Sequence, residues 1–144
     1  MTLPTGFEQM PPHLAAGGPF HELIGPIFIK RLPNGLIAGL HVDRRHENLA
    51  GNMHGGMLAS FVDTAFAYGV RWSQDPPISG VTTTLSIEFI SAAPTGKWIE
   101  AHVDVVRSGS RVVFLNCFVW HDGKRVARAS ASCQVAGLYK PPHG

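Results

Sequence analysis

Hydrophobic positions change their period along this chain, and each period predicts a different kind of element. Between residues 53 and 72, in MHGGMLASFVDTAFAYGVRW, apolar residues recur at positions 57, 58, 61, 62, 65, 66 and 69–70. Spacings of three and four residues are those of one face of an α-helix. Because this segment is apolar nearly all round, we expect a helix that is buried on most sides.

Short segments on both sides of the predicted helix have the character of β-strands. Before it, LIGPIFIKR and GLIAGLHVD are separated by the turn LPNG, which predicts a hairpin. After it, apolar and polar residues alternate from residue 79, with Val81, Leu85 and Phe89 in phase and Thr82 out of phase. Three more strands are expected at about 97–107, 111–121 and 124–137. Two strands, one helix and four antiparallel strands predict an α+β architecture, with one helix on one sheet.

The segment HDGK indicates a tight hairpin turn, which allows the two cysteines to be placed. An Asp-Gly pair is typical of a two-residue turn, so the strands before and after residues 122–123 should pair. Counting away from the turn along both strands puts Cys117 opposite Arg128 and Cys133 opposite Val112. We therefore expect two free thiols, as in a reducing compartment.

Length and composition bound the number of domains and the nature of the surface. The chain has 144 residues, enough for one domain with its own core. We expect that domain at residues 21–138, a loosely ordered arm rich in Pro and Gly at residues 1–20, and a tail at residues 139–144. Only 15% of the residues are charged, against roughly 25% in an average soluble domain. We therefore expect another chain to cover part of the surface.

The net charge and the first residues limit the classes of binding partner and the cellular compartment that we expect. The net charge of +2 is too small to predict binding to nucleic acid or to an anionic membrane. The start, MTLPTGFEQMPPHL, has neither the cationic end nor the apolar run of a signal peptide, and no window is apolar over the length of a membrane span. We therefore expect a cytoplasmic protein.

A carboxylate, Asp63, interrupts the apolar run of the predicted helix, and Gly55 and Gly56 open that helix. The first N–H groups of a helix have no intrahelical partner and carry partial positive charge, and glycine lets a ligand come close to them. Such donors can hold the oxyanion that forms when a carbonyl is attacked. Asp63 could then be the base that activates water, or itself the nucleophile.

The spacing of these groups predicts that two chains share one site. Gly55 and Asp63 are eight residues apart, which is roughly 12 Å along a helix, whereas reacting atoms meet at roughly 3 to 3.5 Å. If both groups act on one carbonyl, the helices of two subunits must run antiparallel across a two-fold axis. We therefore expect a dimer as the smallest functional unit.

The segment NLAGNMHGGMLASFVDTA resembles the PaaI-like and THEM2-like acyl-CoA thioesterases of the hotdog superfamily. That family has an Asn, a His-Gly-Gly six residues later, and an Asp nine residues after the His. The positions that match in identity and spacing are Asn48, His54, Gly55, Gly56 and Asp63. GVTTTLSIEFISAAPTG is similar to the next strand of the family and DGKRVARASAS to its last hairpin, so the resemblance covers roughly residues 35–137.

The resemblance implies a fold, a reaction and a set of site residues. The fold would be a long central helix wrapped by an antiparallel sheet of about five to six strands. The reaction would be hydrolysis of an acyl- or aryl-CoA thioester to the free acid and coenzyme A, with no cofactor. The site would lie at a dimer interface, with Asn48, His54 and Gly55 from one chain and Asp63 from its neighbour. Thr82 falls where the family holds the attacking water, and such dimers pair further into tetramers.

Two other polar segments contain candidate binding residues, for coenzyme A in one and for a metal in the other. RSGSR, at residues 107–111, lies where similar proteins have a coenzyme A loop. We therefore name four residues there and the second helix glycine as substrate contacts: Arg107, Ser108, Gly109, Arg111 and Gly56. HVDRRH, at residues 41–46, contains three potential metal ligands, but their spacing matches no recognised site, so we expect no metal.

Each candidate also has a plain structural interpretation. Asp63 could be an ordinary helix carboxylate, Asn48 could only make a turn, and Thr82 could be an ordinary strand residue. Large apolar residues that could line an acyl pocket could equally be core; they are Phe61, Phe66, Tyr68, Trp72, Phe89 and Trp98. Two other functions stay open, a non-catalytic acyl-CoA-binding protein and a hotdog dehydratase or hydratase, and the acyl group is not determined.

Overall fold

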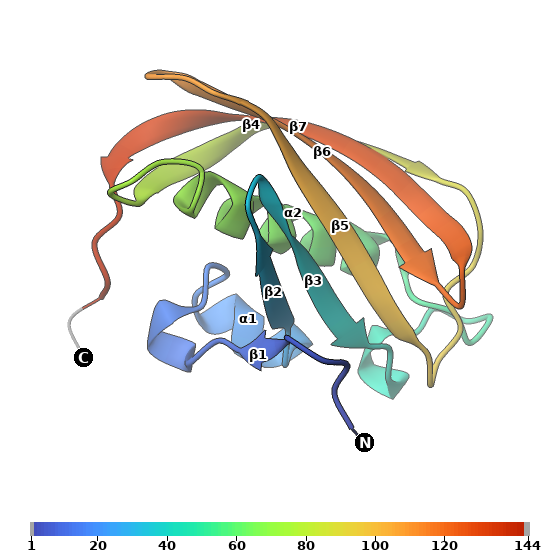
Figure 1. The fold of residues 1–144 in the computed structure, drawn as a ribbon. Helices are drawn as coiled ribbons and strands as arrows, with labels where there is room; N and C mark the ends of the chain where they lie inside the picture. Colours follow the sequence, from blue (N-terminus) through green and yellow to red (C-terminus); the bar gives the residue numbers. More distant parts are fainter. Residues whose placement is uncertain (1, 143–144) are drawn as a thin grey trace.

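The computed structural model describes residues 2–142 and shows one long helix packed on one antiparallel sheet (Figure 1). The helix α2, Gly55–Arg71, lies where the hydrophobic period predicted it. The other elements, in chain order, are β1 Glu8–Gln9, η1 Pro12–Leu14, α1 Pro19–Ile24, β2 Phe28–Leu32, β3 Gly35–His41, η2 Arg44–His46, β4 Ile78–Phe89, β5 Trp98–Ser108, β6 Val112–His121 and β7 Lys124–Leu138. Within residues 2–142, no helix combines the length and apolar character needed to cross a membrane.

The sheet has the strand order β1-β2-β3-β5-β6-β7-β4, and all neighbouring strands are antiparallel. It curves over α2 (Figure 1), and the core fills the space between them. Phe61 and Phe66 of α2 and Leu115 of β6 are each at most 1% exposed. This is the hotdog arrangement, so the predicted α+β fold is confirmed. We expected six strands, and the seventh is β1.

The segment before residue 21 makes specific contacts with the rest of the chain. Strand β1 pairs with β2, placing Glu8 opposite Ile29. The backbone N–H of Ala16 donates to the hydroxyl of Tyr68, on α2, over 3.0 Å. Residues 2–20, where we expected loose order, therefore include a strand and a short helix that lie against the core. Contacts of this kind have no period along the sequence, so the hydrophobic pattern gave no sign of them.

A β-bulge in the last hairpin changes the predicted strand register. Strands β6 and β7 pair as expected next to the turn, but the register shifts by one residue between Val119 and Trp120. Cys117 therefore faces Ala129, and Cys133 faces Val113. The predicted partners were wrong because one extra residue in β7 cannot be counted from the turn. Both cysteines are buried free thiols, as predicted.

A second bulge, in β4, decides which side chains of that strand face α2. The register shifts between Thr82 and Thr84, so that Thr82 pairs with Cys133 and Leu85 pairs with Ala131. Cys133 and Ala131 are two residues apart in β7 and both are buried, so they lie on the same face of the sheet. Thr82 and Leu85 consequently share the face that looks towards α2. Strict alternation had put them on opposite faces.

Candidate functional site

The first turn of α2 presents one open backbone donor. His54 is the N-cap residue, and its Nδ1 accepts a hydrogen bond from the N–H of Gly56 over 2.9 Å. The neutral ring that accepts at Nδ1 carries its proton on Nε2. Within residues 2–142 the N–H of Gly55 has no acceptor. A Cβ at Gly55 would lie 3.5 Å from the ring of Phe89, so this aromatic side chain of β4 lies beside Gly55. The amide of Gly56, a predicted substrate contact, is occupied by the cap.

The loop before α2 is held by the side chain of Asn48. Its Oδ1 accepts from the N–H of Ala50 over 2.9 Å and from the N–H of Asn52 over 3.2 Å. The backbone N–H of Asn48 also donates to the carbonyl of Asn52 over 2.7 Å. Asn48 therefore has the turn-forming role that its residue type allows, and this role uses only the oxygen of its side chain. The amide Nδ2 of Asn48 has no protein acceptor in residues 2–142 and is open to a ligand.

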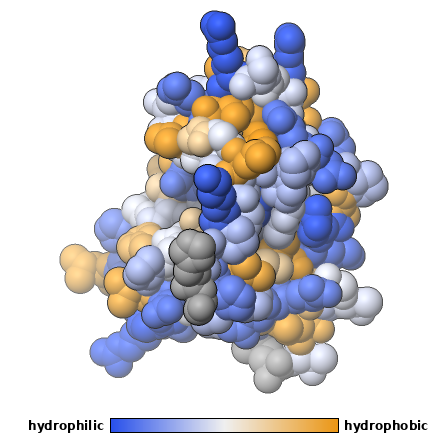
Figure 2. Space-filling model, turned by 90° about the vertical axis from the view of Figure 1, so that its left-hand side faces the viewer, coloured by the Kyte–Doolittle hydropathy of each residue, from blue (hydrophilic) through white to orange (hydrophobic). Residues whose placement is uncertain are grey.

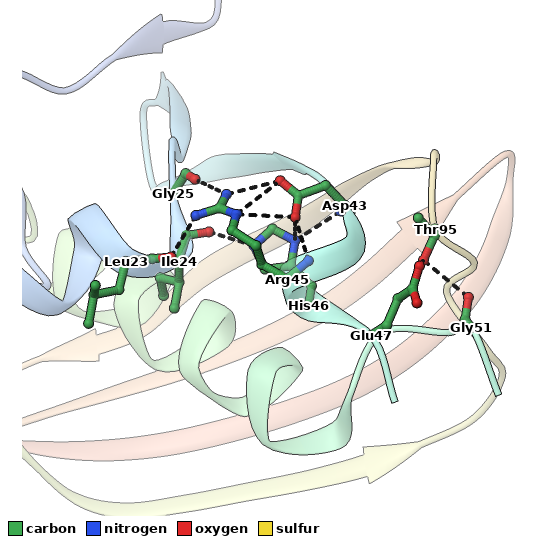
Figure 3. A network of polar contacts seen from close by, with 9 residues as sticks. All are labelled: Leu23, Ile24, Gly25, Asp43, Arg45, His46, Glu47, Gly51 and Thr95. Carbon is green, nitrogen blue, oxygen red and sulfur yellow. Dashed lines mark hydrogen bonds and ion pairs between the residues drawn. The ribbon is translucent and has the colours of Figure 1, made fainter. Parts of the chain in front are cut away.

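An arginine clamp ties this region to the end of α1 (Figure 3). Arg45 donates to the carbonyls of Leu23 and Gly25, each over 2.7 Å. It also binds the carboxylate of Asp43, with Nη2 and Oδ2 2.9 Å apart. These hydrogen bonds from Arg45 are the main reason that the pKa of Asp43 is lowered from its usual value. Asp43 in turn caps η2 by accepting from the N–H of Arg45.

A buried histidine connects the clamp to the start of α2. His46, only 2% exposed, lies with Nε2 2.7 Å from the carbonyl of Ile24, and its Nδ1 accepts from the N–H of Asp43 (Figure 3). The carbonyl of His46 accepts from the N–H of His54 over 2.7 Å. The candidate metal ligands Asp43 and His46 are thus engaged in capping η2, and residues 2–142 hold no cluster of three potential ligands. The three-residue helix η2 therefore fixes the position of His54.

Asp63 and Thr82 are brought together although nineteen residues separate them. The hydroxyl of Thr82 donates to Oδ1 of Asp63 over 2.8 Å. The thiol of Cys133 lies 3.8 Å from Oγ1 of Thr82, and burial raises the pKa of this thiol, so it stays protonated and can act as a donor. Asp63 is partly exposed on α2 and keeps Oδ2 without a protein donor in residues 2–142. This arrangement orients a carboxylate and leaves one oxygen to accept a proton.

The predicted catalytic residues form two groups within one chain. Asn48, His54 and Gly55 gather at the start of α2, whereas Asp63 and Thr82 lie two turns further along it. Eight residues of helix separate Gly55 from Asp63, which is roughly 12 Å. The geometry of one chain therefore keeps the open amide and the carboxylate too far apart to act on the same carbonyl.

The predicted coenzyme A loop lies at the other end of α2. Oγ of Ser108 lies 2.8 Å from Oγ of Ser73 and accepts from Nε2 of Gln74 over 2.9 Å. The carbonyl of Gly109 accepts from the same amide over 2.8 Å. Arg107 and Arg111 are exposed and form no ion pair within residues 2–142. Since α2 spans sixteen steps of about 1.5 Å, this turn is roughly 24 Å from the Gly55 of its own chain.

Sequence reasoning missed the residues that support the site. Arg45 lies in HVDRRH, a segment that suggested only metal ligands. The high density of His, Asp and Arg in that segment was the available sequence signal for the clamp. The contact of Cys133 with Thr82 depends on strand pairing across a bulge, and no sequence signal indicates it.

Comparison with known proteins agrees with this architecture. The thioesterase superfamily matches residues 50–128. A Pseudomonas aeruginosa protein described as an inferred esterase is 34% identical over 133 residues, which are 92% of this chain and 95% of that protein. Human acyl-coenzyme A thioesterase 13 is 26% identical over 96 residues, 66% of this chain and 68% of that protein.

A solved structure shows the same fold. The crystal structure of a hypothetical thioesterase from Streptococcus pneumoniae with coenzyme A superposes with a TM-score of 0.71 at 22% identity, covering 78% of this chain and 90% of that chain. The resemblance to PaaI-like and THEM2-like proteins is confirmed by structures of both kinds with the same fold. The chain therefore belongs to the thioesterase superfamily and is a thioester hydrolase with the hotdog fold.

Proposed function

We propose that this protein hydrolyses acyl-CoA thioesters to a free acid and coenzyme A, with Asp63 as the base that activates water. The observation that carries the proposal is the hydrogen bond from Thr82 to Asp63 on the open face of α2. Thr82 fixes one carboxylate oxygen, so the other can take a proton from water as the water attacks the thioester carbon. The carbonyl oxygen is held by the open N–H of Gly55, where the helix dipole favours the developing negative charge. The thiolate of coenzyme A leaves.

The distance between Gly55 and Asp63 requires these groups to come from two subunits. The part of α2 that is open to solvent carries small side chains next to Asp63, at Gly56, Ser60 and Ala67. A second helix can approach closely there, and an antiparallel partner would place its Gly55 beside Asp63. Strand β4 is an edge of the sheet over twelve residues, and such an edge favours pairing with another chain. We therefore propose a dimer as the catalytic unit and pairing of dimers into a tetramer.

Coenzyme A as the carrier is supported by the relatives and by charge. The human relative is named an acyl-coenzyme A thioesterase, and the Streptococcus structure is named as containing coenzyme A. Arg107 and Arg111, which are exposed and form no ion pair with the described residues 2–142, offer phosphate contacts. Two buried free thiols fit a reducing compartment, and we propose the cytoplasm.

The first experiment follows thiol release from a panel of aliphatic and aryl acyl-CoAs with a colorimetric thiol reagent. We expect the wild type to release thiol and Asp63→Asn to lose most turnover while keeping its fold. Asp104→Asn, at an exposed position of β5, is the matched control and should retain activity. Burial raises the pKa of Cys117 to about 12 and shields both thiols, so the protein itself reacts slowly with the reagent. Full turnover in Asp63→Asn would remove Asp63 from the mechanism, and tight binding without hydrolysis would indicate an acyl-CoA-binding protein.

The second experiment tests whether two subunits build one site. Asn48→Asp keeps the oxygen that holds the loop and removes the amide donors. Each single variant, Asn48→Asp or Asp63→Asn, should be inactive alone. After subunit exchange between them, mixed dimers contain one intact site, so the activity should return to roughly a quarter of the wild-type value. If all groups of a site came from one chain, mixing would restore nothing.

A further inference from the structure

A cavity of about 470 Å³ lies beside the C-terminal half of α2. Its walls are formed by residues 12–19 of the N-terminal segment, by α2, by the start of β4 and by Tyr139. Ala67, which lines it, is one helical turn or about 6 Å along α2 from Asp63. Gly80, which also lines it, precedes Thr82 by two residues. The cavity thus lies about one helical turn from Asp63, the candidate base, and two residues along β4 from Thr82.

The cavity contains a buried positive charge that nothing in the proposed reaction uses. Arg71 is 9% exposed and lines the cavity. Its guanidinium lies 4.0 Å from the ring centre of Tyr139 and 5.2 Å from that of Tyr68, and it donates to the carbonyl of Leu14. No carboxylate in residues 2–142 pairs with it. Burial is the main reason that the pKa of Arg71 is lowered, and the two tyrosines oppose this.

A guanidinium in this position lacks acceptors. It carries five N–H donors, and one protein acceptor is present within residues 2–142. A buried charge without a counter-ion is strongly unfavourable, and a carboxylate matches the planar fork of an arginine with two parallel hydrogen bonds. The hydroxyl of Tyr139, a second lining residue, is buried and has no hydrogen-bond partner within residues 2–142. Two polar groups that line the same cavity therefore have hydrogen-bonding capacity that residues 2–142 do not fill.

Part of the remaining wall suits a short hydrocarbon chain. Ala16, Ala67 and Ile78 present apolar surface, whereas His13, Ser79 and the exposed Glu22 are polar lining residues. Figure 2 shows the side of the molecule on which the C-terminal segment and α1 lie, and hydrophobic side chains there form separate patches among hydrophilic ones. This side of the molecular surface is therefore mixed in polarity.

We propose that this cavity receives the acyl group of the substrate and that Arg71 binds a carboxylate at the far end of that group. The inference rests on the proposed function and names its substrate class, the mono-CoA thioesters of dicarboxylic acids. Arg71 is then a specificity-determining residue that contacts the acyl end, assisted by the hydroxyl of Tyr139.

The test compares thioesters of equal chain length with and without the terminal carboxylate. Glutaryl-, adipyl- and suberyl-CoA are paired with pentanoyl-, hexanoyl- and octanoyl-CoA, and kcat/KM is measured for each. We expect the wild type to prefer at least one carboxylate-ended member by about tenfold. Arg71→Gln should remove this preference by lowering kcat/KM for the carboxylate-ended member of a pair more than for the uncharged one, and Arg71→Lys should keep part of it. Arg31→Gln is the matched control, because Arg31 lies over the ring of Trp72 at 4.4 Å and is exposed.

Further measurements separate the alternatives. N-acetylcysteamine thioesters of adipate and hexanoate lack the phosphates of coenzyme A, so a preference that persists in them places the anion at the acyl end. Loss of the preference in these short thioesters would assign Arg71 to a phosphate and overturn the proposal. Equal rates of the wild type on both members of all three pairs would also overturn it, and so would dissociation of the oligomer in Arg71→Gln, which would assign Arg71 to an interface.

A second variant and a binding measurement test the cavity if Arg71→Gln does not fold or if no thioester is hydrolysed. If Arg71→Gln does not fold, Tyr139→Phe, which removes only the hydroxyl, should reduce the wild-type preference, and an unchanged preference would count against the site. If no thioester is hydrolysed at all, the proposed function fails. The cavity is then tested by thermal unfolding, where adipate but not hexanoate should stabilise the wild type, and an equal response to both acids would refute the carboxylate contact.

Discussion

The side chain of His54, which caps α2, packs closely over the Cα of Gly56. A Cβ at Gly56 would lie 3.1 Å from two atoms of the His54 ring, whereas a Cβ at Gly55 would meet the ring of Phe89 at an ordinary 3.5 Å. The two glycines of the motif therefore have different roles. Gly56 makes room for the cap, and Gly55 supplies the open amide.

This difference predicts unequal effects of two similar substitutions on stability. Gly56→Ala should displace the His54 ring and lower the free energy of unfolding by about 1 kcal/mol, the usual value of an N-cap, which is a fall in Tm of roughly 2–4 °C. Gly55→Ala should leave the stability nearly unchanged. Thermal unfolding of both variants beside the wild type checks this. Equal losses in the two variants would show that the cap contributes nothing.

From the hydrogen bond between Thr82 and Asp63, we expect substitution of Thr82 to change turnover rather than stability. Thr82→Val keeps the shape and removes the donor to Asp63, so kcat should fall by about tenfold, the value of one hydrogen bond to a charged group, with little change in KM. Thr82→Ser should retain most of kcat, because its hydroxyl can make the same bond. A wild-type kcat in Thr82→Val would show that this hydrogen bond does not orient the base.

At the scale of elements, the short helix η2 links α1 to α2. Arg45 holds the end of α1, His46 holds the start of α2, and Asp43 caps η2 between them (Figure 3). The pKa of Asp43 is lowered in the folded protein. Its contribution to stability is therefore present above its unfolded pKa, near 3.8, and is lost as the pH falls through the lower folded value.

Asp43→Asn should consequently change how stability depends on pH. At neutral pH the variant should be less stable by a few tenths of a kcal/mol, a small value because the Asp43 side chain is half exposed. At about pH 3 the difference should shrink, since the wild type has by then lost most of its charge-dependent gain. Urea unfolding at both pH values measures this. A difference that grows on acidification would contradict the assigned direction of the pKa shift.

At the scale of the molecule, the open face of α2 and the free edge of β4 point to association. Ala59 lies midway between Gly55 and Asp63, so in an antiparallel pair it lies next to the two-fold axis. It is only partly exposed in the single chain. A large charged side chain at this position would face the same side chain of the partner subunit across the two-fold axis.

Ala59→Arg should therefore dissociate the oligomer and abolish thioester hydrolysis. The protomer should stay folded, because Arg is nearly as favourable in a helix as Ala. Light scattering after gel filtration gives the mass, and circular dichroism checks the fold. A variant that remains a dimer would place the interface elsewhere, and an active monomer would overturn the two-chain site.

Much of this structure follows from the sequence, because local periods report local contacts. Spacings of three and four residues placed α2 to within two residues, and alternation placed β4 to β7. The motif from Asn48 to Asp63 placed the candidate site and its family, since the chemistry of an open helix start and a carboxylate depends on residue type and spacing. The proposal that two chains share one site rests on the rise of a helix and on Gly55 and Asp63 acting on the same carbonyl.

The tertiary structure decided what no local period encodes. The bulge in β4 turns Thr82 towards Asp63, and the bulge near Trp120 sets the partners of Cys117; an extra residue in one strand becomes visible only when its neighbour is paired with it. The burial of Arg71 depends on the arm at residues 12–19, whose contacts with α2 are far apart in sequence and have no period. Residue types and spacings thus define the candidate catalytic groups, while long-range packing defines the cavity that we propose for the acyl group.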